Sequence, residues 1–190
     1  MSMYRGSNKT ALLSQKLIGD AILRLLDTKS FAEITVSDLC REAEVSRQTF
    51  YSLFGSKENV ILYTLRSSFC FTPENNKNIC RSASFHLFCR SYSTFIIENR
   101  RLLEILVKNE MMHFLYDVQY QTFMECEHFF GDVTGESRIY LIDFIAGGMS
   151  GIAKNYVLTG CRADEKFLEK LMFSLFGGLY FMHGDAVDNE

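Results

Sequence analysis

Proline is almost absent from this chain, and that absence limits the possible folds more than any other feature. Among 190 residues there are one proline, Pro73, and 12 glycines, so few positions break a helix or form the tight turns that join strands. Apolar residues recur at helical spacing over most of the chain. The sequence therefore predicts an all-α protein with about nine helices, at residues 8–26, 35–44, 47–53, 56–71, 79–97, 102–106, 111–130, 136–158 and 163–182.

Charge and cysteine usage suggest the compartment. The formal net charge is −3, six cysteines are scattered without a CxxC pair, and the N-terminus shows no apolar signal core. We therefore expect reduced thiols in a cytoplasmic protein, with a thiol-sensing role as an open alternative. The longest apolar stretch, residues 140–158, contains Asp143, Lys154 and Asn155, so we expect no membrane span.

Residues 35–53 combine two short helical patterns with a tight connection. Thr35 or Ser37 can cap the first helix, and Ser46 can cap the second, which runs from Arg47 to about Leu53. Two short helices joined by a turn of three or four residues are typical of a helix-turn-helix. The spacing therefore predicts a DNA-binding element.

The second of these helices has one apolar stripe, and its other side chains suit a nucleic acid. Arginine and glutamine can hydrogen-bond base edges, while hydroxyl groups and tyrosine can hold phosphates. We expect Arg47, Gln48 and Ser52 to contact bases. Phosphate contacts are expected from Thr35, Ser46, Thr49, Tyr51 and Lys57. The alternative for these residues is an ordinary solvated surface or, for the hydroxyls, helix capping alone.

The order of residue types in this region resembles a known family. The segment TVSDLCREAEVSRQTFYSLFGSKENVILYTL is similar to the DNA-binding domain of TetR-family transcriptional regulators, over roughly residues 10–65. The resemblance implies an N-terminal three-helix domain containing the helix-turn-helix, followed by a helical dimerisation and ligand-binding domain. It also implies a phosphate contact for Tyr51. Leu53 stands where the family often has a histidine, and leucine cannot hydrogen-bond a phosphate.

We place the domain boundary near residue 62. Residues 1–62 would form the DNA-binding domain and residues 63–190 the dimerisation and effector-binding domain. The first 62 residues are close to neutral, whereas the remainder carries the net negative charge. This asymmetry has the sign that DNA binding requires, but it is small, so the motif carries the prediction.

Glycines within the helix predicted at 136–158 suggest a helix–helix interface. Gly147 and Gly151 lie four residues apart on one face, although glycine costs about 1 kcal/mol relative to alanine inside a helix. Close approach of a second subunit would explain them, and TetR-like proteins dimerise through their last two helices. The predicted homodimer interface contains Ile139, Gly147, Gly151, Leu168, Leu171, Met172 and Leu175. Packing within one subunit is the alternative.

The middle helices contain many aromatic residues, as an apolar effector pocket would. The predicted pocket residues are Phe88, Tyr92, Phe95, Met111, Phe114, Tyr120 and Phe123. A plain aromatic core is the alternative. In family relatives, a small molecule bound there moves the two DNA-binding domains apart, which the resemblance implies as a mechanism here.

The sequence shows no motif that is typical of an enzyme. The four histidines lack metal-ligand spacing, and no phosphate loop, nucleophile elbow or carboxylate pair is present, so we expect no enzyme, no metal and no cofactor. The leading interpretation is a dimeric regulator that binds a near-palindromic operator, most often as a repressor released by a small apolar or aromatic ligand. The alternatives are a protein-interaction co-regulator on the same fold and a ligand sensor that has lost DNA binding.

Overall fold

A computed structural model describes residues 6–69, 81–125 and 133–182, and all regular structure in these ranges is α-helical. The all-α prediction is therefore confirmed for the described part of the chain. The helices are α1 (Lys9–Thr28), α2 (Val36–Glu42), α3 (Arg47–Leu53), α4 (Lys57–Ser68), α5 (Arg81–Glu98), α6 (Arg100–Lys108), α7 (Met112–Glu125), α8 (Gly135–Leu158) and α9 (Glu165–Met182). Within the described residues, no helix is both long and apolar enough to cross a membrane.

The predicted helix limits differ most around α6 and α7. α6 is longer than the predicted 102–106, because it begins directly after Asn99 and continues to Lys108. α7 is described to Glu125, and the predicted continuation to 130 lies outside the described residues.

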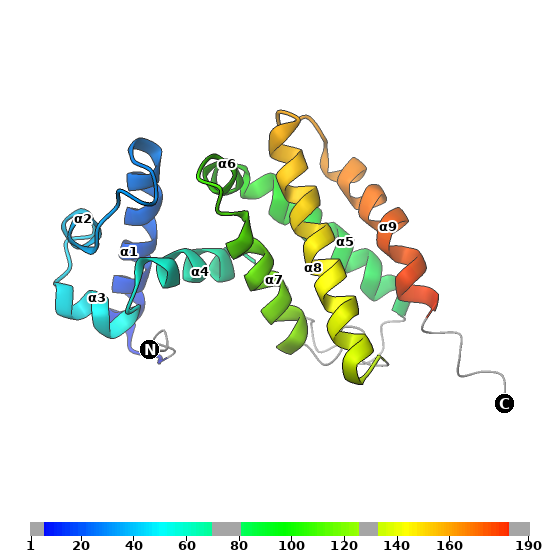
Figure 1. Cartoon of the computed structure of the whole chain (residues 1–190), viewed down its shortest axis with the longest axis horizontal. Coiled ribbons are helices and arrows are strands. Elements are labelled where there is room, and N and C mark those ends of the chain that lie inside the picture. The colour runs from blue at the N-terminus through cyan, green and yellow to red at the C-terminus, as the bar shows by residue number, and fades with distance from the viewer. Residues whose placement is uncertain (1–5, 70–80, 126–132, 183–190) are drawn as a thin grey trace.

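The helices form two groups joined by α4 (Figure 1). Helices α1, α2 and α3 lie at one end of the molecule, and α5 to α9 form a bundle at the other. In the N-terminal group, Phe50 of α3 and Phe54 are fully buried together with Ile22 and Leu26 of α1. These aromatic side chains fix α3 on α1 and leave its opposite side outside the core.

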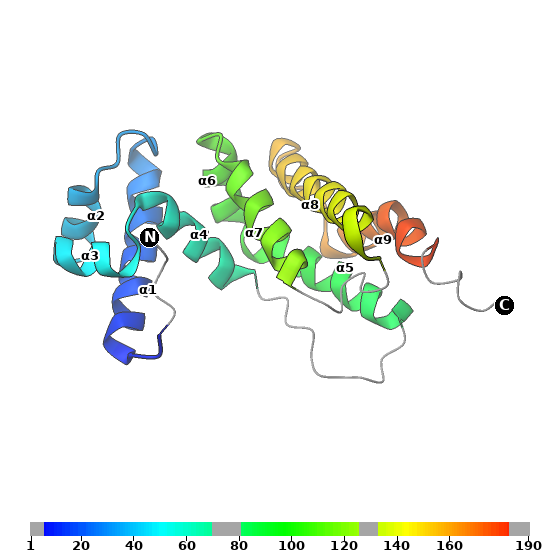
Figure 2. The ribbon, with the colours of Figure 1, turned by 60° about the horizontal axis from the view of Figure 1, so that its bottom comes forward.

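Helix α4 belongs to both groups. It packs on α1 at one side and on α7 at the other, and a second view shows it between the two bodies (Figure 2). Val60, Ile61 and Leu65 are its fully buried residues. The boundary that we predicted at residue 62 falls in the middle of this helix, so one rigid element connects the two predicted domains.

A buried polar chain crosses the C-terminal bundle. The Tyr92 hydroxyl of α5 donates to the Met149 carbonyl of α8 at 3.0 Å and accepts from the Gln119 amide at 2.6 Å. Ser150 donates in turn to the Gln119 amide oxygen at 2.7 Å. Buried polar groups are costly unless they are paired, so this network fixes the relative positions of α5, α7 and α8.

The α1–α2 loop touches the C-terminal bundle. The Phe31 ring packs edge-on against Phe114 of α7, and the Phe31 N–H donates to the Asn109 side-chain oxygen at 3.1 Å. An ion pair between Arg101 and Asp27 lies at the same junction. Phe114, predicted to line the effector pocket, therefore belongs to the contact between the two groups of helices.

Candidate nucleic-acid interface

Side-chain caps define the helix-turn-helix. The Thr35 hydroxyl accepts from the Asp38 N–H, and the Asp38 carboxylate accepts from the Thr35 N–H, which forms a reciprocal capping box at the start of α2. Ser46 caps α3 by accepting from the Thr49 N–H at 3.0 Å. Between the helices, Glu44 adopts φ 55°, a left-handed conformation that turns the chain sharply. Local chemistry thus sets the angle between α2 and α3.

Helix α3 presents a polar side to solvent. Phe50 and Leu53 face the core, whereas Arg47, Gln48 and Ser52 are exposed and Tyr51 is 48% exposed. The helix lies at the end of the molecule farthest from α8 and α9, so the bundle does not cover it (Figure 1). A short helix with one exposed polar side is the geometry that enters a major groove.

Several of the predicted contact residues already have partners on the protein. Arg47 donates to the Ser37 hydroxyl at 2.6 Å, which holds its guanidinium against α2. The Ser46 and Thr49 hydroxyls lie 2.8 Å apart, and Ser52 donates to the Thr49 carbonyl at 2.9 Å. Gln48 and Tyr51 are exposed and take no part in these local hydrogen bonds. Arg47 must exchange its Ser37 bond for any base contact.

Leu53 has a structural role that its position in the motif did not suggest. Its side chain is 4% exposed and lies on the core side of α3 with Phe50. The apolar residue therefore adds to the packing of α3, and the phosphate contact expected from a histidine at this position has no counterpart here.

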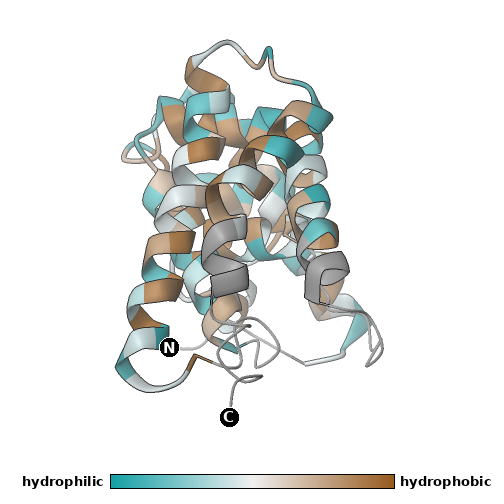
Figure 3. Cartoon of the chain, turned by 90° about the vertical axis from the view of Figure 1, so that its right-hand side faces the viewer, coloured by the Kyte–Doolittle hydropathy of each residue, from teal (hydrophilic) through white to brown (hydrophobic). Residues whose placement is uncertain are grey.

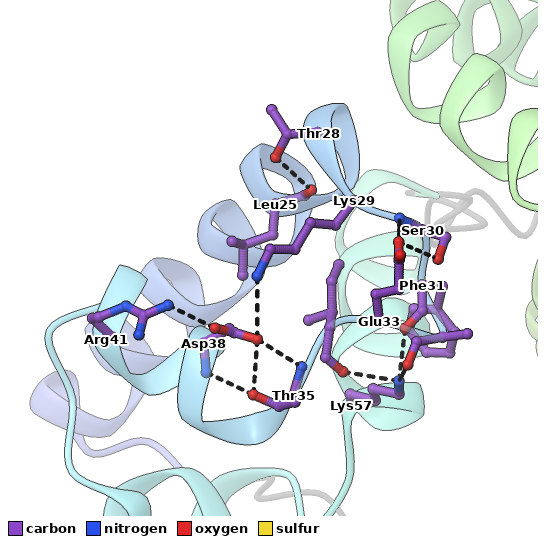
Figure 4. A network of polar contacts seen from close by, with 12 residues as sticks. Leu25, Thr28, Lys29, Ser30, Phe31, Glu33, Thr35, Asp38, Arg41 and Lys57 are labelled. Atoms are coloured by element: carbon purple, nitrogen blue, oxygen red, sulfur yellow. Dashed lines mark hydrogen bonds and ion pairs between the residues drawn. The ribbon is translucent and has the colours of Figure 1, made fainter.

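The Lys57 ammonium does not point into solvent as its predicted phosphate contact requires. It donates to the carbonyls of Phe31 at 2.6 Å, Ile34 at 2.9 Å and Ala32 at 3.4 Å, and it lies 4.5 Å from the centre of the Phe31 ring (Figure 4). An ammonium has three hydrogens to donate, and all three are used here. The prediction is corrected in this respect: Lys57 holds the α1–α2 loop onto the start of α4.

Asp38 organises the other half of the same network. Its carboxylate accepts hydrogen bonds from the Thr35 hydroxyl and from Arg41, the latter at 2.6 Å (Figure 4). It also forms an ion pair with Lys29 at 3.5 Å. The Thr35 hydrogen bonds, followed by the charge of Lys29, lower the pKa of Asp38 from 3.8 to about 2. Sequence reasoning named Thr35 but missed Asp38, although a Thr-x-x-Asp pattern before an apolar run is a capping signal.

A sequence comparison covers this part of the structure. Residues 18–64 match the family described as bacterial regulatory proteins, tetR family. That range includes most of α1, all of α2 and α3, and the first part of α4. This part of the chain is therefore similar to the tetR family of bacterial regulatory proteins, and we refer to residues 18–64 as the TetR-family domain.

Curated relatives align with parts of the chain. The regulator EthR of Mycolicibacterium smegmatis is 62% identical over 39 residues, 20% of this chain and 18% of EthR. DhaS of Lactococcus lactis, an activator of the dhaKLM operon, is 28% identical over 78 residues, 41% of this chain and 42% of DhaS. The chain thus matches less than half the length of either relative.

A solved structure extends the likeness beyond the TetR-family domain. NalD, the secondary repressor of the MexAB-OprM multidrug efflux pump in Pseudomonas aeruginosa, superposes with a TM-score of 0.58 over 92% of this chain and 97% of NalD. The identity is 15%, so this similarity establishes the shared fold alone.

Behind the TetR-family domain, the bundle contains a cavity of about 250 Å³ between the end of α4 and α5. Three of the predicted pocket residues, Phe88, Tyr92 and Phe95, line it. Phe123 packs edge-on against Phe88 and lies behind that wall. Of the other predicted pocket residues, Met111, Phe114 and Tyr120 do not line this cavity.

The predicted dimer residues separate into two groups. Ile139, Gly147 and Leu175 are exposed, and Gly151 and Leu171 are partly exposed. Leu168 and Met172 are 2% and 0% exposed, because they pack inside the bundle, so they cannot contact a second subunit in this conformation. We correct the prediction at these two positions.

A stripe of exposed residues on α8 was missed by the sequence analysis. Tyr140, Phe144 and Leu158 are 74%, 61% and 60% exposed, and they share one helical face with Gly147 and Gly151. Figure 3, viewed from this end of the molecule, shows hydrophobic positions along the helices there. On α9, Phe167 and Leu175 are also more than half exposed. Exposed apolar patches of this kind mark interaction surfaces.

Proposed function

We propose that this protein is a cytoplasmic, dimeric, sequence-specific DNA-binding transcriptional regulator. The observation that carries the proposal is the exposed polar side of α3 in a TetR-family domain, with Gln48 and Tyr51 directed away from the protein core. Arg47, Gln48 and Ser52 would contact bases, while Tyr51, Thr49, Ser46 and Thr35 would hold the phosphates on either side.

The exposed stripe on α8 supports the dimer. Gly147 and Gly151 have no atoms within 4 Å of an added Cβ, so a partner helix can approach the backbone closely at these positions. Tyr140 and Phe144 extend the same face and would be buried by that partner. A second copy packed here would present two α3 helices to successive major grooves, about 34–36 Å apart.

The cavity in the bundle supports control by a ligand. Because α4 packs both on the bundle and on α1, a ligand that binds one dimer geometry better than another would change the affinity for DNA. We propose that the protein acts as a repressor that its ligand releases. NalD is named a repressor and DhaS an activator. Transcription from the adjacent promoter, measured with and without the protein, therefore decides between repression and activation.

Selection of bound sequences from random DNA, followed by affinity measurements across salt, tests this function. Gln48→Ala should relax the preference at one or two base pairs by about 1–3 kcal/mol, because a base-edge contact is lost. Tyr51→Phe should weaken binding to all sequences similarly, because it removes a phosphate contact.

The measurement also separates the alternatives. A regulator that neutralises several phosphates loses affinity by orders of magnitude between low and physiological salt. A protein-interaction co-regulator would show no enriched sequence and little salt dependence. The assigned roles are wrong if Tyr51→Phe changes the preferred sequence while Gln48→Ala leaves it intact.

A further inference from the structure

The cavity beside α5 has an aromatic floor and a polar rim. Its lining comes from the end of α4 and from one face of α5: Ser68, Phe69, Phe88, Ser91, Tyr92, Thr94, Phe95 and Glu98. The four aromatic residues are at most 8% exposed, whereas Ser91 and Glu98 are exposed. A ligand here would therefore bury its apolar body and keep one polar end near the rim.

The aromatic floor is tightly ordered. Phe69 packs edge-on against Phe95 and Tyr92, with ring centroids 5.3 and 5.9 Å apart, and Tyr92 stacks on Phe95. The Tyr92 hydroxyl already donates to the Met149 carbonyl and accepts from Gln119. A ligand can therefore use the ring of Tyr92 without competing for its hydroxyl, and the floor offers π-electron surface in place of hydrogen bonds.

The rim carries negative charge. Glu98 is the charged residue among the described lining residues, and none of these residues is basic. A second carboxylate lies next to the rim, since Thr94 donates its hydroxyl to Glu165 of α9 at 2.7 Å. This environment repels an anion and attracts a cation more strongly than a neutral ligand.

We propose that the cavity binds an organic cation, an amine with an aromatic or aliphatic body. The body would lie against Phe69, Phe88 and Phe95, and the ammonium would lie at the rim near Glu98. Aromatic rings attract cations through their negative faces, and a carboxylate at the opening adds a charge of the required sign. The assignment deepens the proposed function, since it rests on the cavity being the effector site.

Three probes of one shape and different charge test the ligand class. We would titrate the full-length protein with 2-phenylethylamine, 2-phenylethanol and phenylacetate by isothermal calorimetry at neutral pH. The protonated amine should bind on the order of 5–10-fold more tightly than the alcohol, because only its positive charge makes a cation–π contact and an ion pair with a carboxylate. Phenylacetate should bind most weakly.

Variants identify the groups responsible. Glu98→Gln should reduce the affinity for the amine to near that of the alcohol and change alcohol binding much less, because the glutamine oxygen can still accept from the hydroxyl. Glu110→Gln, at an exposed loop position outside the lining, is the matched control and should behave as wild type. Phe95→Leu keeps an apolar wall but removes a π face, so it should weaken amine binding more than alcohol binding.

The outcomes are decisive in both directions. Equal binding of the amine and the alcohol, tighter binding of phenylacetate, no binding of any probe, or an unchanged preference in Glu98→Gln would each overturn the cation assignment. DNA binding is measured on the same samples without probe. If the protein binds its selected DNA but does not prefer the amine, the proposed regulatory function stands and the cation assignment is wrong. If the protein does not bind DNA, the proposed function is contradicted, and the probe titrations still test which ligand class the cavity binds.

Discussion

At the residue scale, Asp38 and Lys57 show how single side chains hold the DNA-binding domain in shape. Asp38 ties the start of α2 to Lys29 and Arg41, and Lys57 ties the preceding loop to α4. Neither residue needs to contact DNA to affect how the protein binds it. Both set the position of the helix-turn-helix relative to the rest of the molecule.

The Asp38 network predicts a pH dependence of stability. The folded pKa of about 2 lies below the ordinary 3.8, so the stabilisation is fully present above pH 3.8 and is lost as the pH falls towards 2. Asp38→Asn should lower the melting temperature at pH 7, and the wild-type and variant curves should converge near pH 2. Circular dichroism at several pH values checks this, with Asp20→Asn at an exposed position of α1 as the control.

Lys57→Met keeps the apolar stem and removes the ammonium. We expect a loss of about 1–3 kcal/mol in the free energy of unfolding, because the Phe31 and Ile34 carbonyls lose a charged donor. Chemical denaturation measures that loss. Below the unfolding temperature, the salt slope of DNA binding should match that of wild type, whereas a phosphate contact by Lys57 would reduce the slope by about 1.

At the element scale, α8 has two different faces. Gly147 faces open space, but a Cβ at Gly148 would lie 2.9 Å from the Phe176 ring of α9. Phe176 is 4% exposed and has little room to move. Gly147 therefore lies on the exposed surface of α8, whereas its neighbour Gly148 allows the close internal contact with α9.

Two matched substitutions separate these roles. Gly147→Leu should leave the fold intact, since the site is open and glycine is a poor helix former, but should convert the proposed dimer to monomers. Gly148→Leu should lower the free energy of unfolding by roughly 1–3 kcal/mol through overpacking against Phe176. Sedimentation velocity and thermal unfolding of both variants test the prediction. An intact Gly147→Leu dimer would count against the α8 face as the interface.

The elements themselves were predictable from sequence to different degrees. The helix-turn-helix was predictable from its capping residues and residue order, because Thr35 and Ser46 accept hydrogen bonds from backbone N–H groups only three residues ahead. The role of Lys57 was not predictable, because its carbonyl partners lie 23 to 26 residues earlier in the chain. Leu168 and Leu175 are both leucines in the apolar pattern of α9, so the sequence alone does not distinguish them. The packing of α9 on α5 buries Leu168 and leaves Leu175 exposed.

At the scale of the whole molecule, a symmetric dimer predicts strict spacing of the two half-sites. Inserting about 5 base pairs at the centre of the selected site turns one half-site to the opposite side of the duplex. Affinity should then fall to the level of a single half-site, and a further 5 base pairs should not restore it fully, because the bundle fixes the separation of the α3 helices. Fluorescence anisotropy with the three DNA lengths measures this. Equal affinity for all three would contradict a rigid dimer.

Helix α4 connects the bundle to the helices of the helix-turn-helix group, because it packs on α7 and on α1. Its 12 residues give it a length of about 18 Å, so a tilt of about 10° where it meets α7 would displace its other end by about 3 Å. That displacement is close to the rise of one base step, about 3.4 Å. In the proposed regulator, a tilt of this size directed along the duplex would shift α3 by about one base step.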